Sequence, residues 1–204
     1  MTENNNQHAY LAWTKQRLDE MDAALASFEI KASLVKADAK AKAAQLQADM
    51  KQRRADFESE VKAQVTASEA TLQASKAQLE KQWVSFETEL KAYMETAGKD
   101  IDHKRETFAN IAAAQTKTWA EDIEKLKGNA TKLGTEGKAK ADKAIAQMQS
   151  TATEARTHID KFKQAGDESW TALSLALQTT RKKFDDASHS AWAAIKNVVP
   201  APKQ

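Results

Sequence analysis

The sequence predicts an all-α protein, either an elongated antiparallel coiled coil or a long helical bundle, with no β-sheet. Alanine, lysine, glutamine and glutamate dominate the 204 residues, and there are only five glycines. Both prolines, Pro200 and Pro202, lie in the last five residues. Such a composition is typical of long helices and coiled coils. No alternating β-branched run and no Asn-Gly or Asp-Gly pair is present, so nothing predicts a β-hairpin.

A stripe of apolar residues is the third observation, and it runs along almost the whole chain. It begins at Leu11 and continues in steps of three, four and seven residues as far as Ala97. It resumes at Ile101 with the same spacing. Steps of this kind place side chains on one face of a helix. They predict two arms, at about 8–97 and 100–199.

The two arms form a single extended helical domain over residues 8–199 in this interpretation. Residues 1–7 are predicted to be a disordered polar lead, and residues 200–204 are a tail that the prolines separate from the last helix. An interruption is predicted near 128–137, where three glycines fall within ten residues.

Four glycines are candidate turn residues. Gly98 precedes Lys99 and Asp100, so it is either the reversal between the arms or a tolerated glycine inside one long helix. The other three candidate turns are Gly128, Gly134 and Gly137.

A bundle of three helices, each of about 60 residues at 1.5 Å rise per residue, is the alternative architecture. It reverses near 66–69 and near 128–137. Thr66 and Glu69 have the spacing of a capping box, which supports the first reversal. Five tryptophans and six phenylalanines are bulky for a two-stranded seam, and this favours additional helices, self-association or an apolar partner.

An aromatic repeat near the carboxyl end is the most distinctive pattern in the sequence. The pattern Phe-x-x-Ala-x-x-x-x-Trp-x-Ala-[Leu/Ile] begins at Phe162 and again at Phe184, 22 residues later, so both copies share one helical face. Because its side chains are large and aromatic, we expect other residues or a partner to cover them. The candidate packing or interface residues are Phe162, Trp170, Leu173, Leu177, Phe184, Trp192 and Ile195.

This repeat resembles the amphipathic repeats of apolipoprotein A/E-like helical proteins. The segment from Trp192 to Lys196 is similar to small bacterial coiled-coil proteins of unassigned role. In size and composition the chain also resembles phasins, which coat storage granules. The sequence departs from the apolipoprotein pattern because no proline separates the repeats before Pro200.

Charge and composition narrow the classes of function. The net charge is +2, from 31 basic and 29 acidic side chains that are interspersed, which is unlike a nucleic-acid binder. The chain has no cysteine, no run of 18 apolar residues and no secretory signal pattern at its start. We expect a cytoplasmic protein without a transmembrane segment.

No catalytic motif is recognisable. Three histidines have acidic neighbours at helical spacing, namely His103, His158 and His189, but such neighbours arise readily among 29 acids. We therefore predict no metal, no cofactor and no catalytic residue, and no enzyme.

The sequence favours a non-enzymatic structural or interaction protein. In this hypothesis a helical rod self-associates or binds a protein partner through its aromatic stripe. The alternative is a peripheral amphipathic protein that coats lipid, membrane or storage granules.

Overall fold

The computed structural model describes residues 3–31, 35, 37, 39–63, 69–97, 101–164 and 170–195. These residues form six α-helices and no strand. The helices are α1 Glu3–Lys31, α2 Lys40–Ala63, α3 Glu69–Ala97, α4 Ile101–Ala130, α5 Thr135–Gln164 and α6 Trp170–Ile195. The predicted all-α class is confirmed, whereas the prediction of a disordered lead is wrong for residues 3–7, which are the first residues of α1.

The stretch 8–97 is divided among three helices, so the continuous arm that the apolar stripe predicts is not found. The residues between α1 and α2 include neither glycine nor proline. The spacing of apolar residues indicates which face of a helix is buried. It cannot reveal a break between two helices when both bury the same face. Ala39 is the residue that caps the start of α2, because its carbonyl accepts a hydrogen bond from the amide of Ala43 at 2.9 Å.

Two predicted reversals fall between helices. The one near 66–69 lies between α2 and α3, and Gly98 lies between α3 and α4. Thr66 and Gly98 themselves are outside the described residues.

Contacts divide the chain into two compact units, where the sequence predicted one extended domain. Unit 1 comprises Met1–Lys15 and Thr116–Gln204, and unit 2 comprises Gln16–Gln115. The divisions fall inside α1 and α4, so each of these helices contributes one part to each unit.

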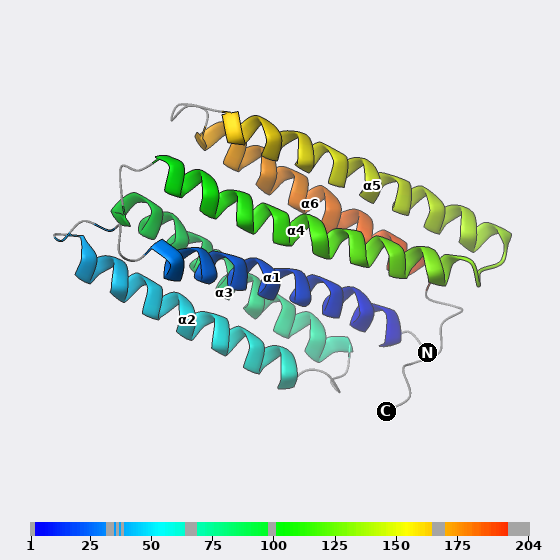
Figure 1. Ribbon diagram of the computed structural model, residues 1–204. Coiled ribbons are helices and arrows are strands. Elements are labelled where there is room, and N and C mark those ends of the chain that lie inside the picture. Colours follow the sequence, from blue (N-terminus) through cyan, green and yellow to red (C-terminus); the bar gives the residue numbers. More distant parts are fainter. Residues whose placement is uncertain are drawn as a thin grey trace. The chain divides into compact units, whose positions relative to one another are not determined.

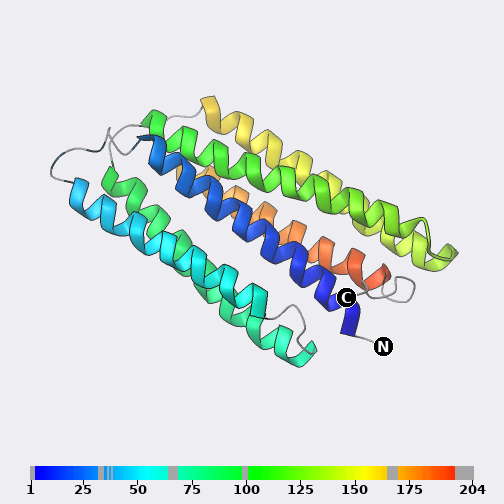
Figure 2. The same cartoon turned by 60° about the horizontal axis from the view of Figure 1, so that its bottom comes forward.

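Unit 2 is built around the antiparallel pair α2 and α3, which lie side by side in Figures 1 and 2. The later part of α1 and the earlier part of α4 complete it. Phe28 of α1 packs on Tyr93 of α3 with ring centroids 3.9 Å apart. The largest fully buried side chains of this unit are Met21, Phe28, Met50, Phe57, Leu79, Phe86 and Tyr93.

Unit 1 is built around a second antiparallel pair, α5 and α6, which Figure 1 shows side by side. The earlier part of α1 and the later part of α4 join it. Small side chains form most of the buried face of α5 and allow a neighbouring helix to approach closely. The buried residues of α5 are Ala141, Ala144, Ile145, Met148, Thr151, Ala152, Ala155 and Ile159.

The reversal between α4 and α5 occupies residues 131–134. The amide of Leu133 bonds to the carbonyl of Ala130 at 3.2 Å, and the Thr131 hydroxyl bonds to the carbonyl of Gly128 at 2.8 Å. Gly134 precedes α5, and its carbonyl accepts the amide of Lys138 at 2.9 Å.

Gly128 and Gly137 are helical residues, so the interpretation of both as turn residues is wrong. Neither they nor Gly134 adopt a left-handed backbone. The chain reverses here through tightened backbone bonds at the end of α4, a device that ordinary residues can supply.

Candidate functional site

The described members of the aromatic repeat lie in the core of unit 1. Phe184 is 1% exposed and Trp192 is 4% exposed, and Leu177 and Ile195 are equally buried on α6. The side chains of the other candidates are outside the part of the chain that the structure describes, namely Phe162, Trp170 and Leu173. The carboxyl-terminal copy of the repeat therefore packs against its own chain.

Phe184 stacks face to face on Trp119 of α4. Their ring centroids are 4.1 Å apart and the ring planes differ by 4°. Trp119 is fully buried, so this pair joins α4 to α6 through a large apolar contact.

A buried carboxylate joins the same two helices one turn further along. Asp122 of α4 is 7% exposed. Its Oδ2 accepts a hydrogen bond from Ser188 Oγ at 2.7 Å, and its Oδ1 accepts one from Trp192 Nε1 at 3.2 Å. Both carboxylate oxygens are thus bonded to α6.

Burial raises the pKa of Asp122 above its ordinary value of 3.8, and nearby Asp185 acts in the same direction. The bonds from Ser188 and Trp192, together with the charge of Lys125, act against this rise. The carboxylate is therefore costly to ionise, and its hydrogen bonds offset part of that cost.

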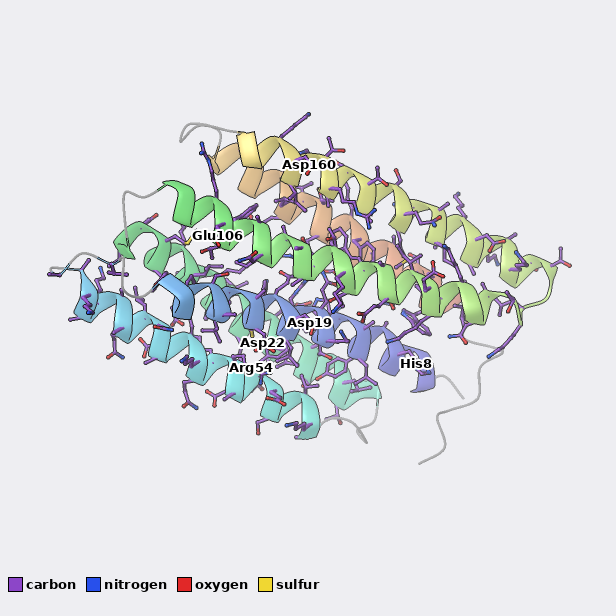
Figure 3. All side chains as sticks on the ribbon, in the orientation of Figure 1. His8, Asp19, Asp22, Arg54, Glu106 and Asp160 are labelled. Atoms are coloured by element: carbon purple, nitrogen blue, oxygen red, sulfur yellow. The ribbon has the colours of Figure 1, made fainter. Side chains whose placement is uncertain are left out.

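His8 of α1 stacks on a face of the indole of Trp192. The two rings stack with centroids 5.0 Å apart and an interplanar angle of 16°. Figure 3 labels His8 near the start of α1. Burial lowers the pKa of His8 below its ordinary value of 6.5, so α1, α6 and α4 meet at a neutral imidazole, an indole and a carboxylate in series.

Chemically, this arrangement joins helices. The Ser188 hydroxyl donates to Asp122, and the imidazole of His8 faces a ring instead of a hydroxyl. Activation of a serine nucleophile requires a base that accepts the hydroxyl proton and is itself oriented by a third group. This geometry is that of a packed polar cluster.

Unit 2 has its own buried charges, on α1. Glu20 is fully buried, and its Oε1 accepts bonds from Arg17 NH1 at 3.1 Å and from Gln16 Nε2 at 3.3 Å. The guanidinium of Arg17 also lies over the ring of Trp83 in α3, 5.1 Å from its centroid. The cation–π contact therefore joins α1 to α3, and the ion pair within α1 neutralises the buried guanidinium.

Two adjacent arginines connect α2 to its neighbours in unit 2. Arg54 makes a bidentate contact with Asp22 of α1, from Nε to Oδ1 at 2.7 Å and from NH2 to Oδ2 at 3.0 Å, and it also bonds to Glu58. Figure 3 labels Asp22 and Arg54 where α1 and α2 face one another. Arg53 Nε bonds to Glu89 Oε1 of α3 at 2.5 Å. The bond to Asp22 is the main reason that the pKa of Arg54 is raised.

The sequence interpretation missed the buried polar residues. A signal for Asp122 was present, since it lies three residues after Trp119 and four before Leu126 and so shares their face. Glu20 gave a similar signal, because it lies four residues before buried Ala24. What the sequence could not supply were the partners of Asp122 on α6, and the contact of Arg17, which pairs with Glu20, with Trp83 on α3.

The acid–histidine spacings do not assemble into a cluster. His158 Nε2 is 3.7 Å from Glu154 Oε1, a carboxylate that also pairs with Lys183 at 3.1 Å. His189 is exposed, and the side chain of His103 is outside the described residues. Among the residues that are described, no group of three or more acidic or histidine side chains could hold a metal ion.

Comparisons with known proteins give no relative. No protein-family model matches the chain, and neither a curated protein nor a solved structure matches it significantly. None of the helices described by the structure has the length and apolar character needed to cross a membrane.

Proposed function

We propose that the protein is a non-enzymatic structural or interaction protein whose helical units bind a protein partner or a second copy of the chain. The observation that carries this proposal is that buried charged side chains connect helices to one another. Asp122 bonds α4 to α6, and Arg17, which pairs with Glu20 inside α1, packs α1 on Trp83 of α3. Ionisable groups placed this way fix the packing of helices, as a structural protein requires.

Exposed helical faces are better candidates for the interface than the aromatic repeat. Phe184 and Trp192 already fill a core, so binding through them would need that core to open. The large exposed apolar side chains in the described part are Val84 of α3, 59% exposed, and Leu175 of α6, 63% exposed. Exposed residues of this kind are common singly, and they become informative when their replacement changes association.

Sedimentation velocity over a wide range of protein concentrations tests the proposal. We expect the weight-average mass to rise with concentration, or a defined complex to form with a partner. Val84→Lys and Leu175→Lys should weaken that association, because a charge at a packed interface must be desolvated. Ala146→Lys adds the same charge at an exposed position of α5 and is the matched control. A chain that stays monomeric and forms no complex with another protein would contradict the proposal.

A surface coat on lipid or storage granules is the second candidate. The helices are 24 to 30 residues long and most of them bury one apolar face. Helices of that length and pattern also suit an interface between water and lipid. Trp119 and Trp192 are already buried, so tryptophan fluorescence is a poor reporter, and co-flotation with anionic vesicles is the better test. A chain that stays at the bottom of the gradient excludes a lipid coat.

A further inference from the structure

Helix α2 is attached to unit 2 through fewer buried side chains than any other helix. Its buried residues are Ala43, Met50 and Phe57. Every other helix buries more than twice as many side chains among the described residues. The three are spaced seven residues apart, so they form one narrow line of contact instead of a broad apolar stripe.

Charge pairs lie beside this narrow line. Arg54 contacts Asp22 with two parallel bonds, and Arg53 contacts Glu89. The side chains in these pairs are partly exposed to solvent. Dissolved salt therefore weakens them, which it does much less for buried apolar contacts.

The site in unit 2 that α2 occupies fits a helix with a specific pattern of side chains. It takes a helix with a small, a flexible and an aromatic side chain at seven-residue spacing. Between the second and third of these it takes two adjacent basic residues, which meet the acids Asp22 and Glu89. A segment with this combination exists in the chain itself, at residues 40–63.

We propose that α2 is an exchangeable helix of unit 2 and that α2 of a second copy of the chain takes its place. Elements with few buried contacts open at lower free energy than the rest of a fold. Exchange of an identical element between copies restores every contact that opening breaks, and it is a low-cost route to a dimer. This inference rests on the proposed function, because it specifies how copies associate.

Amide hydrogen exchange on the full chain tests the first half of the inference. At low salt we expect the amides of α2 to exchange at least about tenfold faster than those of α3, since opening of α2 alone leaves α3 in place. The ratio should grow at high salt and in Arg54→Ala. Lys42→Ala removes an exposed cation from the same helix and should leave the ratio unchanged. Exchange of α2 that is as slow as that of α3 would overturn the inference.

A labelled peptide of residues 40–63 tests the second half. We expect fluorescence anisotropy to show that it binds the full chain, and that Arg54→Glu in the peptide reduces this binding by tenfold or more, because the altered peptide competes with an unaltered α2 whose Arg54 contacts Asp22. Arg54→Gln in the peptide, which removes the charge without reversing it, should give an intermediate loss, and circular dichroism checks that the free peptides have the same helix content. A peptide that fails to bind, or an Arg54→Glu peptide that binds as well as the unaltered one, would overturn the exchange.

The outcomes separate this inference from the proposed function. If the chain self-associates while the peptide neither binds nor competes, helix exchange is wrong and the proposed function stands. If sedimentation shows neither self-association nor a complex, the proposed function is wrong, even where hydrogen exchange finds α2 opening readily.

Discussion

Asp122 places a carboxylate in the core of unit 1. Its two hydrogen-bond donors on α6 offset part of the free energy that burial of this group costs. Ser188 and Trp192 each supply one donor. Replacement of Asp122 by alanine would leave both donors buried without an acceptor. We expect Asp122→Ala to lower the free energy of unfolding by about 1–3 kcal/mol, measured by urea titration.

The raised pKa of Asp122 also predicts a pH dependence. The folded state keeps this proton to higher pH than the unfolded state, whose carboxyl has the ordinary pKa of 3.8. The contribution of Asp122 to stability is therefore full below that pH and is lost as the pH rises through the folded pKa. Asp122→Asn cannot ionise, and its side-chain oxygen still accepts one hydrogen bond.

Urea titrations of wild type and Asp122→Asn from acidic to neutral pH check this prediction. As the pH rises, the unfolding free energy of Asp122→Asn should increase relative to that of wild type. A difference that stays constant with pH would show that the carboxylate is not penalised by its burial.

His8 should give a pH dependence of the opposite sign in the same unit. Burial lowers its pKa, so below pH 6.5 the unfolded state takes up the proton first. The stability that neutral His8 contributes is present above pH 6.5 and is lost as the pH falls through the folded pKa. His8→Phe retains an aromatic ring on Trp192 and removes the titration.

We expect wild type to lose stability relative to His8→Phe as the pH falls from neutral to mildly acidic, as measured by urea titration. If the stabilities of wild type and His8→Phe change in parallel with pH, the stacked position of His8 has no influence on its protonation.

The buried pair of Arg17 and Glu20 predicts a large single-mutant effect in unit 2. Glu20→Ala leaves a buried guanidinium without its carboxylate, and we expect a cost of about 3–5 kcal/mol. Arg17→Met with Glu20→Leu removes both charges and should cost clearly less than Glu20→Ala alone, because no unpaired charge remains. A double variant that is less stable than the single one would mean that the pair stabilises the fold beyond what apolar packing can replace.

At the scale of elements, the end of α4 offers a direct test of the glycines. Gly128 is helical and exposed, and no atom lies within 4 Å of the position of an added Cβ. We expect Gly128→Ala to raise the free energy of unfolding by about 1 kcal/mol, the difference in helix propensity. Thermal unfolding followed by circular dichroism measures it.

Gly134 provides the contrast, since it precedes α5 and its carbonyl accepts the first bond of that helix. Alanine is a poorer residue than glycine at such a position, so Gly134→Ala should give no gain in stability. Equal stabilisation by both substitutions would mean that propensity, and not position, determines the effect.

Helix type could be predicted from the sequence, whereas helix ends could be predicted only in part. Alanine-rich composition and apolar spacing are local properties, so they predict the all-α class. The reversal at 131–134 was predicted through its glycines, although backbone bonds accomplish it. The break after Lys31 was missed, because only packing against other helices distinguishes it from a continuous helix.

The candidate site shows the same limit. The spacing predicted that Phe184 and Trp192 need a cover, and both are covered. Their covers, Trp119 and His8, lie on α4 and α1. Pairings between distant segments depend on topology, which a periodic pattern leaves open because many registers satisfy it.

At the scale of the whole molecule, the two units differ in how the chain supplies them. Unit 2 is one uninterrupted stretch, Gln16–Gln115, whereas unit 1 joins Met1–Lys15 to Thr116–Gln204. The stack of His8 on Trp192 joins residues from opposite ends of the sequence.

That division implies an order of events as the protein is made. All of unit 2 has left the ribosome before α6 is synthesised, so the contacts within unit 2 can form first. The first turns of α1 can pack on Trp192 only after α6 has been made. Closing a long loop costs entropy that local pairings avoid, and this delays unit 1 in refolding as well. Pulse labelling of amides during refolding should therefore protect α3 before α6.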